Sequence, residues 1–321
     1  MWNLPGAPWL IAHKSMLPVN KPKLFTICGQ DYVLWKNEKG EISALDNICP
    51  HLGAKLSDGW ICNKTNTIAC PYHGVEFDGE GRAILGSEKI SKPLAKKLDI
   101  IVQGNWVWTY ANTEPRIPIP NAMEEIENEY FFAGVSGDFT IQAPLLYALE
   151  VNHDYNHAKA THRDLFKFKD IQIDSFDHKD YFSVVHLHQI REDNTFAEYI
   201  QNPLLLSYPK SIKAVAKSYF PSIVAFYSDT PLGSICDVFV IYPEAENKTR
   251  TFMLIYRSRS LGILNSITDK LLIQAGDDVL HQDAHVIENL YPRFEPKMRL
   301  PNEQPWNWVR KLYFDSPNPP Y

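Results

Sequence analysis

The sequence predicts an α+β protein made of two domains, an all-β domain followed by a domain of mixed α and β structure. Short strand-like runs separated by turn residues fill the first third of the chain. A segment with three prolines follows at residues 112–121, and its spacing excludes a helix or a central strand. Longer strand-like and helix-like runs occupy the remainder. We therefore place the two domains at residues 1–114 and 115–321.

The turns of the first domain contain Gly, Asn or Asp, as expected of a meander of antiparallel strands. One hairpin is expected at Gly79–Gly81, and a closing hairpin is expected at Gly104-Asn105. The predicted strands are Lys23–Cys28, Tyr32–Trp35, Ile42–Leu45, Val75–Phe77 and Ile100–Tyr110.

The second domain shows both strand-like and helix-like patterns. Helices are expected around residues 145–160 and 266–290. The spacing of Lys210, Lys213 and Lys217 suggests a basic helical face, which is either solvated or a docking face for an acidic protein. The predicted strands are Tyr130–Phe132, Ile171–Phe176, Tyr181–Leu187, Ile223–Phe226, Cys236–Tyr242 and Thr251–Tyr256.

Composition excludes several classes of protein. A net charge of -6, from 32 basic and 38 acidic residues, gives no reason to expect nucleic acid or an anionic membrane surface as a partner. No apolar run is long enough to span a membrane, and the first residues lack the pattern of a signal peptide. Cys28, Cys62 and Cys236 follow no pattern and are interpreted as buried or inert thiols. We therefore expect a cytoplasmic protein.

Two short segments carry the first metal-binding pattern. Cys49-Pro50-His51 is followed by Cys70-Pro71-Tyr72-His73, so each segment supplies one thiolate and one imidazole. Two Cys and two His are the ligands of a Rieske 2Fe-2S cluster. The same set also suits a structural zinc ion, although zinc sites of this composition more often place the two Cys together and the two His together.

These segments resemble the cluster-binding loops of the Rieske family. The resemblance implies that Cys49 and Cys70 bind one iron and that His51 and His73 bind the other. Leu52 stands where many oxygenase members have Arg, which we interpret as subfamily variation with no effect on ligation.

Two further positions indicate which kind of Rieske protein this is. In the Rieske proteins of quinol complexes each loop carries an additional Cys, and the two form a disulfide that raises the potential of the cluster. Ala54 and Tyr72 occupy those positions here. The resemblance therefore implies a cluster of lower potential that passes electrons to a catalytic partner.

Asp154, His157 and His162 form the second pattern, Asp-x-x-His-x-x-x-x-His. At ~100° per residue His162 would lie ~140° around a helix from His157, so an unbroken helix cannot direct both imidazoles to one ion. The spacing therefore predicts a helix break or π-bulge between residues 157 and 162. The pattern matches the motif of the Rieske non-haem iron oxygenases, and Glu150 matches an acidic residue found in several monooxygenase branches.

An iron site of this type needs two His and one carboxylate, which leaves positions for O₂ and water. The carboxylate is expected from the late helix at residues 269–290, where only Asp283 projects along the centre of the apolar stripe. The segment around Asp283 also resembles the third-ligand segment of the family, although a buried Asp that caps a loop is the alternative. The stripe is formed by Leu272, Val279, Leu280, Val286, Ile287 and Leu290.

Other acidic and imidazole groups compete for these roles. His153, next to Asp154 in the sequence, is a candidate to contact an iron ligand from outside the metal site. The remaining groups are expected on the other side of the helix or in structural or solvated positions: Asp277, Asp278, Glu288, His281, His285, His186 and His188.

The resemblance extends from the strand at Trp9 to the C-terminal helix and implies a terminal oxygenase (α) subunit with a helix-grip-like catalytic domain whose sheet is antiparallel. An NAD(P)H-fed ferredoxin or flavin reductase would supply electrons to the 2Fe-2S cluster. The electrons would pass through Asp154 to a mononuclear Fe(II) held by His157, His162 and Asp283. The resemblance also implies a head-to-tail homotrimer, in which Asp154 bridges His157 of its own chain and His73 of a neighbouring chain. The reaction would consume O₂.

The implied reaction is hydroxylation, demethylation or desaturation of a small, largely apolar substrate, by a monooxygenase rather than a dioxygenase. An electron carrier without oxygenase activity and a zinc-stabilised binding module are the alternatives. The substrate pocket is expected between residues 165 and 260, where core packing is the alternative role for the aromatic residues Phe166, Phe168, Phe220, Phe226, Tyr227 and Phe239.

Overall fold

The computed structural model confirms the α+β fold class. The chain divides into two compact units, one of residues 5–119 and one of residues 1–4 and 120–321. The first is built of β-strands, and the second combines a large sheet with helices. The structure describes residues 4–86, 88–201, 209–230, 233–258, 262, 265–292 and 296–316.

The first unit contains three antiparallel sheets, with strand orders β1-β11-β10, β2-β3-β4 and β5-β6-β7-β8-β9. Trp9, Trp106 and Trp108 are fully buried between neighbouring strands. The strands are β1 (Trp9–His13), β2 (Lys23–Ile27), β3 (Gln30–Lys36), β4 (Ile42–Asp46), β5 (Trp60–Cys62), β6 (Thr67–Ala69), β7 (Glu76–Phe77), β8 (Arg82–Leu85), β9 (Glu88–Pro93), β10 (Ile100–Gln103) and β11 (Trp106–Thr109), with two 3₁₀ turns at Lys14–Met16 and Leu56–Asp58.

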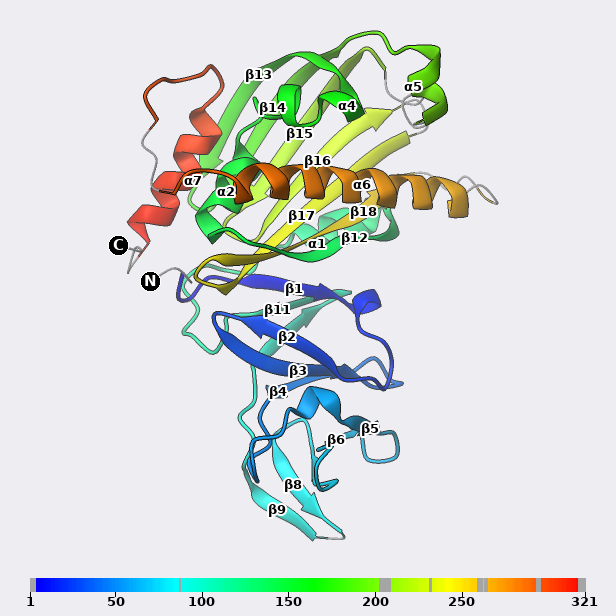
Figure 1. Ribbon diagram of the computed structural model, residues 1–321, viewed down its shortest axis with the longest axis vertical. Helices are drawn as coiled ribbons and strands as arrows, with labels where there is room; N and C mark the ends of the chain where they lie inside the picture. Colours follow the sequence, from blue (N-terminus) through cyan, green and yellow to red (C-terminus); the bar gives the residue numbers. More distant parts are fainter. Residues whose placement is uncertain are drawn as a thin grey trace. The chain divides into compact units, whose positions relative to one another are not determined.

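The second unit is organised around a seven-stranded antiparallel sheet of order β12-β18-β17-β16-β15-β14-β13 (Figure 1). Only the pairing of β12 with β18 departs from the simple succession of neighbours along the chain. Its elements are α1 (Ala122–Glu129), β12 (Phe131–Ile141), α2 (Leu145–His153), α3 (Ala158–Thr161), α4 (Arg163–Phe166), β13 (Phe168–Lys179), β14 (Phe182–Arg191), α5 (Phe196–Gln201), β15 (Ser211–Tyr219), β16 (Ile223–Thr230), β17 (Gly233–Ala245), β18 (Lys248–Arg257), α6 (Asn265–Glu288) and α7 (Gln304–Asp315).

Helix α6 runs across one face of this sheet (Figure 1). The buried Ser136 of β12 donates a hydrogen bond from Oγ to the carbonyl of Ile273, 2.7 Å away, which ties the helix to the edge strand. Gly137 has a φ of +64°, and a Cβ there would lie 2.4 Å from a methyl group of Leu280. The strand and the helix therefore pack as closely as they do because position 137 is glycine.

The apolar stripe of α6 is narrower than the sequence suggested. Val279, Leu280 and Ile287 are buried as expected. Val286 is 37 % exposed, and Leu290 lies beyond the end of the helix at Glu288. The predicted stripe was therefore wrong at its C-terminal end, because the last residues of the pattern continue past the sheet that buries the rest.

The predicted basic helical face at Lys210, Lys213 and Lys217 is wrong, because this segment enters strand β15. Buried and less buried residues alternate along β15. Lys213 and Lys217 share the outward side of the alternation, while Lys210 precedes the strand. The lysine spacing fits a helix and a strand equally well, and pairing with β14 and β16 decides in favour of the strand.

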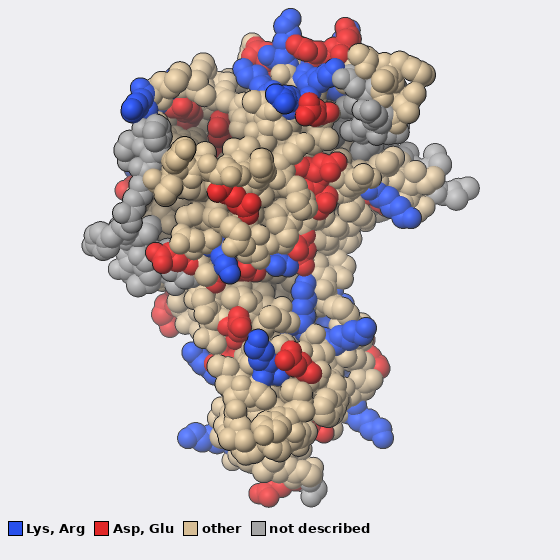
Figure 2. All heavy atoms as spheres, viewed as in Figure 1, with Lys and Arg blue, Asp and Glu red and all other residues tan. Residues whose placement is uncertain are grey.

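No described helix is long and apolar enough to cross a membrane. Acidic and basic side chains are interspersed on the face shown in Figure 2, in keeping with the modest net charge of the whole sequence.

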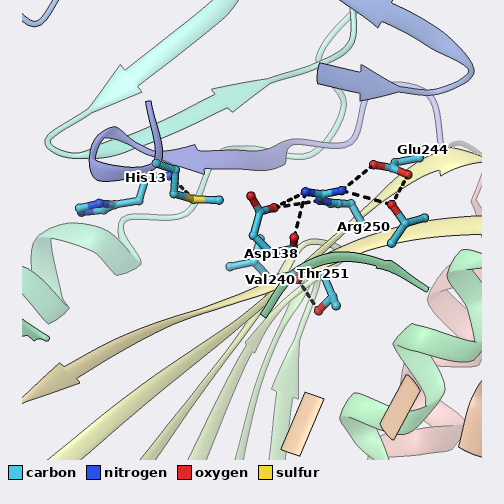
Figure 3. Close-up of polar contacts among 8 residues, drawn as sticks. His13, Asp138, Val240, Glu244, Arg250 and Thr251 are labelled. Carbon is cyan, nitrogen blue, oxygen red and sulfur yellow. Dashed lines mark hydrogen bonds and ion pairs between the residues drawn. The ribbon is translucent and has the colours of Figure 1, made fainter. Parts of the chain in front are cut away.

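Arg250 of β18 connects three neighbouring strands (Figure 3). Its Nε and Nη2 atoms donate to Oδ1 of Asp138 on β12, at 2.8 and 2.7 Å. Its Nη1 lies 3.5 Å from Glu244 on β17, and Thr140 donates a hydrogen bond to the same carboxylate at 2.7 Å. The network holds the edge strand against the centre of the sheet.

Replacing Arg250 with Met should lower the free energy of unfolding by about 1–2 kcal/mol, since Asp138 and Glu244 lose a partly buried partner. The midpoint of urea unfolding measures the effect. Lys210→Met is the control, because the Lys210–Asp193 pair is more than three-quarters exposed and should contribute little to stability. Equal effects of the two changes would contradict a structural role for the Arg250 network.

Candidate metal centres and substrate cavity

The two Cys-His loops of the first unit have matching backbones. The amide of Cys49 donates to the carbonyl of Ala54, and the amide of Gly53 donates back to Cys49. Cys70, Gly74 and Val75 repeat this pattern with distances of 2.9 Å. Gly53 and Gly74 both have positive φ, +77° and +68°, which a glycine adopts without strain. The sequence thus builds the same tight loop twice, after β4 and after β6.

The four candidate cluster ligands lie together at the ends of these loops. Cys49 and Cys70 are buried, and their thiols contact each other. His51 and His73 are exposed, and their ring centres are 4.7 Å apart. Burial raises the pKa of the Cys49 thiol, so a thiolate in this position calls for a nearby positive charge. Two buried sulfurs beside two paired imidazoles fit the donor set of a Rieske cluster.

The second unit places His157 and His162 at the two ends of a single helical turn. Helix α2 ends at His153, and α3 supplies only the four residues between the two histidines. The backbone leaves the helix again at His162, with φ -103° and ψ 21°. The predicted break between residues 157 and 162 is therefore misplaced, because the helix is interrupted before and after this turn rather than within it. His157 and His162 are the residues that cap the turn, and this brings their imidazoles together.

Asp283 of α6 completes a triangle with the two histidines. The Nε2 atoms of His157 and His162 are 3.2 Å apart, and Oδ1 of Asp283 lies 3.2 Å from each. Donor atoms about 2.1 Å from one ion and on one of its faces lie about 3 Å from each other. The three ligand atoms therefore lie close enough together to hold one metal ion.

Hydrogen bonds at the other ring nitrogens leave both Nε2 atoms free. Nδ1 of His162 donates to Oε1 of Gln282 at 2.8 Å, and Nδ1 of His157 donates to the carbonyl oxygen of Asp154. Such contacts fix the tautomer and orientation of a metal-binding imidazole. Gln282, next to Asp283 on α6, had not been singled out from the sequence.

The contact between Asp154 and His157 differs from the one expected. The main-chain carbonyl of Asp154 accepts the imidazole hydrogen, while its carboxylate accepts a hydrogen bond from the amide of Asn156 at 3.0 Å. Asp154 ends α2 with φ -97° and ψ 94°, and this extended backbone directs the carbonyl to the ring. The carboxylate is thus not required to orient His157.

The triangle is stable only if a positive charge lies among its atoms. Asp283 is 6 % exposed, and its Oδ1 is buried without a suitably oriented hydrogen-bond donor. Burial by itself would raise the pKa of Asp283, but the two adjacent imidazoles together have the larger effect, so its pKa is lowered. Burial by itself would lower the pKa of His157, but Asp283 and the Asp154 carbonyl together have the larger effect, so its pKa is raised. Both shifts have the direction expected of a carboxylate beside a cation. The three donor atoms therefore fit a divalent metal.

The alternative acidic and imidazole groups lie elsewhere. His281 contacts the Asp277 carbonyl at an exposed position, and Glu288 accepts from the amide of Gln142. Asp278, His285 and His186 are exposed, and His188 contacts Ser211. Glu150 forms an ion pair with Arg310 of α7. His153 is buried against Trp308 and bonds to the carbonyl of Leu149, so these contacts are structural.

A cavity of about 140 Å³ opens beside the metal-binding triangle, between the sheet and α6. Phe166, Phe168, Phe226 and Phe239 line it, as the sequence suggested, together with the triangle itself. Phe220 and Tyr227 do not line it: Phe220 stacks on Tyr181, and Tyr227 contacts Tyr130. The polar lining residues Asn152, Gln189, Ser228 and Asp237 were missed. Only the alternation along β14, β16 and β17 could have indicated the last three.

The comparisons with known proteins agree with the fold and with the donor sets of both centres. Residues 7–94 match the Rieske [2Fe-2S] domain, and residues 141–308 match the vanillate O-demethylase oxygenase C-terminal domain. The second match spans more than half of the 321 residues. The chain therefore belongs to the family of Rieske oxygenases that carry this C-terminal domain.

Particular relatives include the aminopyrrolnitrin oxygenase PrnD of Pseudomonas fluorescens, 28% identical over 49% of this chain and 46% of the relative. The oxygenase component of dicamba O-demethylase from Stenotrophomonas maltophilia is 28% identical over 53% and 49%. The matched region thus spans just under half of these relatives. The crystal structure of dicamba monooxygenase bound to dicamba superposes with a TM-score of 0.79 over 97% of both chains at 18% identity, which establishes the shared fold.

Replacing Asp283 with Asn should empty the mononuclear site while leaving the cluster intact, because the site loses its single anionic ligand. The affinity for Fe(II) should fall by more than the ~10- to 100-fold that is typical of replacing a residue that only hydrogen-bonds to a metal ligand. Anaerobic Fe(II) titration followed by elemental analysis measures it. Asp278→Asn, an exposed change on the same helix, is the control. Unchanged Fe(II) binding in Asp283→Asn would assign the carboxylate ligand to another residue.

Proposed function

We propose that this chain is the terminal oxygenase component of an O₂-dependent monooxygenase system acting on a small organic molecule. The observation that carries the proposal is that the His157-His162-Asp283 triangle forms part of the wall of an otherwise largely apolar cavity. A structural metal site would be closed by a fourth protein ligand, whereas three protein donors leave positions for O₂ and water.

Each residue of the site has a distinct task. His157, His162 and Asp283 would hold Fe(II), and the Asp154 carbonyl and Gln282 orient the two imidazoles. The iron, when bound, supplies the activation of O₂, and the cluster supplies electrons. The aromatic walls bind the apolar part of the substrate and exclude water. Excluding water limits side reactions that consume O₂ without oxidising the substrate.

The first domain, for which we retain residues 1–114, would receive electrons from a ferredoxin or flavin reductase fed by NAD(P)H. Cys49 and Cys70 would bind the inner iron, and His51 and His73 the outer one. Support comes from the exposure of both imidazoles beside two buried thiols, since an exposed side of the cluster is needed for exchange with another protein. Residues 115–321 would contain the catalytic site.

The cavity favours a small substrate. An engineered protein cavity of about 150 Å³ holds one benzene molecule, which is comparable to the 140 Å³ found here. Relatives of this chain include a cholesterol 7-desaturase and chlorophyllide a oxygenases as well as the dicamba and vanillate demethylases. The volume supports a substrate about the size of a single ring, and hydroxylation, demethylation and desaturation are all open to such a site.

We also propose a head-to-tail homotrimer in which Asp154 of one chain contacts His73 of the next. Two features support this assembly. The Asp154 carboxylate is not used to orient His157, so it is free to accept a second donor. Leu52 and Tyr72, beside the cluster histidines, are 64% and 63% exposed, and such apolar side chains are covered in an interface.

Iron and sulfide analysis of anaerobically purified protein tests the function. About three irons and two sulfides per chain, with a rhombic Rieske signal in electron paramagnetic resonance after reduction, are expected. About two irons with the same signal, and no binding of added Fe(II), would indicate an electron carrier instead. A colourless protein containing zinc would remove both interpretations.

Replacing Asp154 with Ala should keep both metal centres, because the backbone carbonyl that orients His157 remains. Transfer of electrons from the reduced cluster to the iron site should nevertheless slow by about 10- to 100-fold, the usual effect of losing a partner of metal-bound imidazoles. Stopped-flow reoxidation of the cluster by O₂ measures this step. Asp164→Ala, 82% exposed on α4, is the control. An unchanged reoxidation rate would remove the bridging role.

A further inference from the structure

Asp237 lies in the wall of the substrate cavity on β17, a central strand of the sheet. Its neighbours across the two adjacent strands are Phe226 and Ile255, and Phe239 follows two residues later on the same face. A carboxyl at a position whose cross-strand and same-face neighbours are apolar has no favourable contact with the sheet itself.

No described residue forms a hydrogen bond or an ion pair with the Asp237 side chain. Asp237 is partly buried and its side chain lines the cavity, and burial raises its pKa from 3.8 to about 7. A buried carboxyl without a partner destabilises a fold, and nearly all such groups in proteins are paired. The missing partner is therefore expected from the cavity side.

The other polar groups of the cavity narrow the chemistry of that partner. Asn152, Gln189, Ser228 and Tyr155 are neutral, and the other polar lining residues are the metal ligands and Asp237 itself. No Lys or Arg is found among the described lining residues. An anionic substrate group would find no cation from the protein here and would lie near the Asp237 carboxyl, whereas a cationic group would satisfy that carboxyl.

We propose that Asp237 is a specificity-determining residue that binds a protonated amine on the substrate of this enzyme. The proposal rests on the proposed function only in taking this cavity as the substrate site. The carboxylate accepts the N–H hydrogens of the ammonium, and the aromatic walls hold the attached apolar body. Because Asp237 and the metal-binding triangle line one cavity of about 140 Å³, an amine anchored at Asp237 places the rest of a small molecule beside the iron site.

Three probes with the same ring and different polar groups test this assignment: benzylamine, benzyl alcohol and benzoate. Calorimetric titration of the holoprotein at neutral pH should give the tightest binding for benzylamine and the weakest for benzoate. Asp237→Asn keeps the shape of the side chain and removes its charge. It should weaken benzylamine binding about 10- to 100-fold, the range for a charged hydrogen bond, and change benzyl alcohol binding by less than about threefold.

Two controls separate this effect from others. Asp177→Asn makes the same change at an exposed position of β13 and should leave all three affinities unchanged. Metal-depleted protein distinguishes an amine bound to Asp237, whose affinity persists, from one bound to the iron, whose affinity is lost with the metal. Asp237→Asn should not lower the midpoint of thermal unfolding, because it removes no contact within the protein.

A preference of the wild-type protein for benzoate, or an unchanged affinity of Asp237→Asn for benzylamine, would overturn the assignment. A marked loss of thermal stability in Asp237→Asn would do so as well, since it would show that the carboxyl serves the fold. These measurements do not depend on turnover. A protein that binds amines through Asp237 but lacks mononuclear iron would refute the oxygenase function and leave the binding site standing.

Discussion

The catalytic unit depends on holding three lone-pair atoms within 3.2 Å of each other in a buried place. His157, His162 and Asp283 repel one another unless a cation lies among them, because each Nδ1 atom is already used as a donor. The surrounding structure supplies this arrangement at a cost to its own stability. The flanking breaks in α2–α4 and the close packing of α6 on β12 through Gly137 are the means by which it does so.

The two metal centres differ in how far apart in the sequence their ligands lie. In the first unit a single loop design is repeated, with a buried Cys, an exposed His and a Gly at positive φ in each copy. Local hydrogen bonds within six residues suffice to build each loop. In the second unit two ligands are near in sequence and the third comes from a helix more than a hundred residues later. That centre exists only once the sheet and α6 have packed.

The cavity wall shows how a sheet can serve both stability and chemistry. Residues of β14 to β18 line the cavity, alternate ones along β16 and β17, and most of them are apolar or aromatic. Gln189, Ser228 and Asp237 interrupt this pattern on the same face. Polar groups at positions where packing favours apolar ones are typical of binding sites, because a ligand supplies the contacts that the fold does not.

The sequence by itself determined the antiparallel hairpin strands at β2, β3 and β4, the two cluster loops and the proposal of Asp283, since each depends on local spacing or on the period of one helix. It did not determine the strand order of the first unit, in which β1 pairs with β11 nearly a hundred residues later. It did not determine the strand at residues 211–219, because Lys213 and Lys217 satisfy helical and strand spacing alike until β14 and β16 pair with it. Nor did it reveal the carbonyl contact of Asp154, the position of the helix breaks or the polar wall at Asp237. Those features depend on distances between segments remote in the chain, which only tertiary packing fixes.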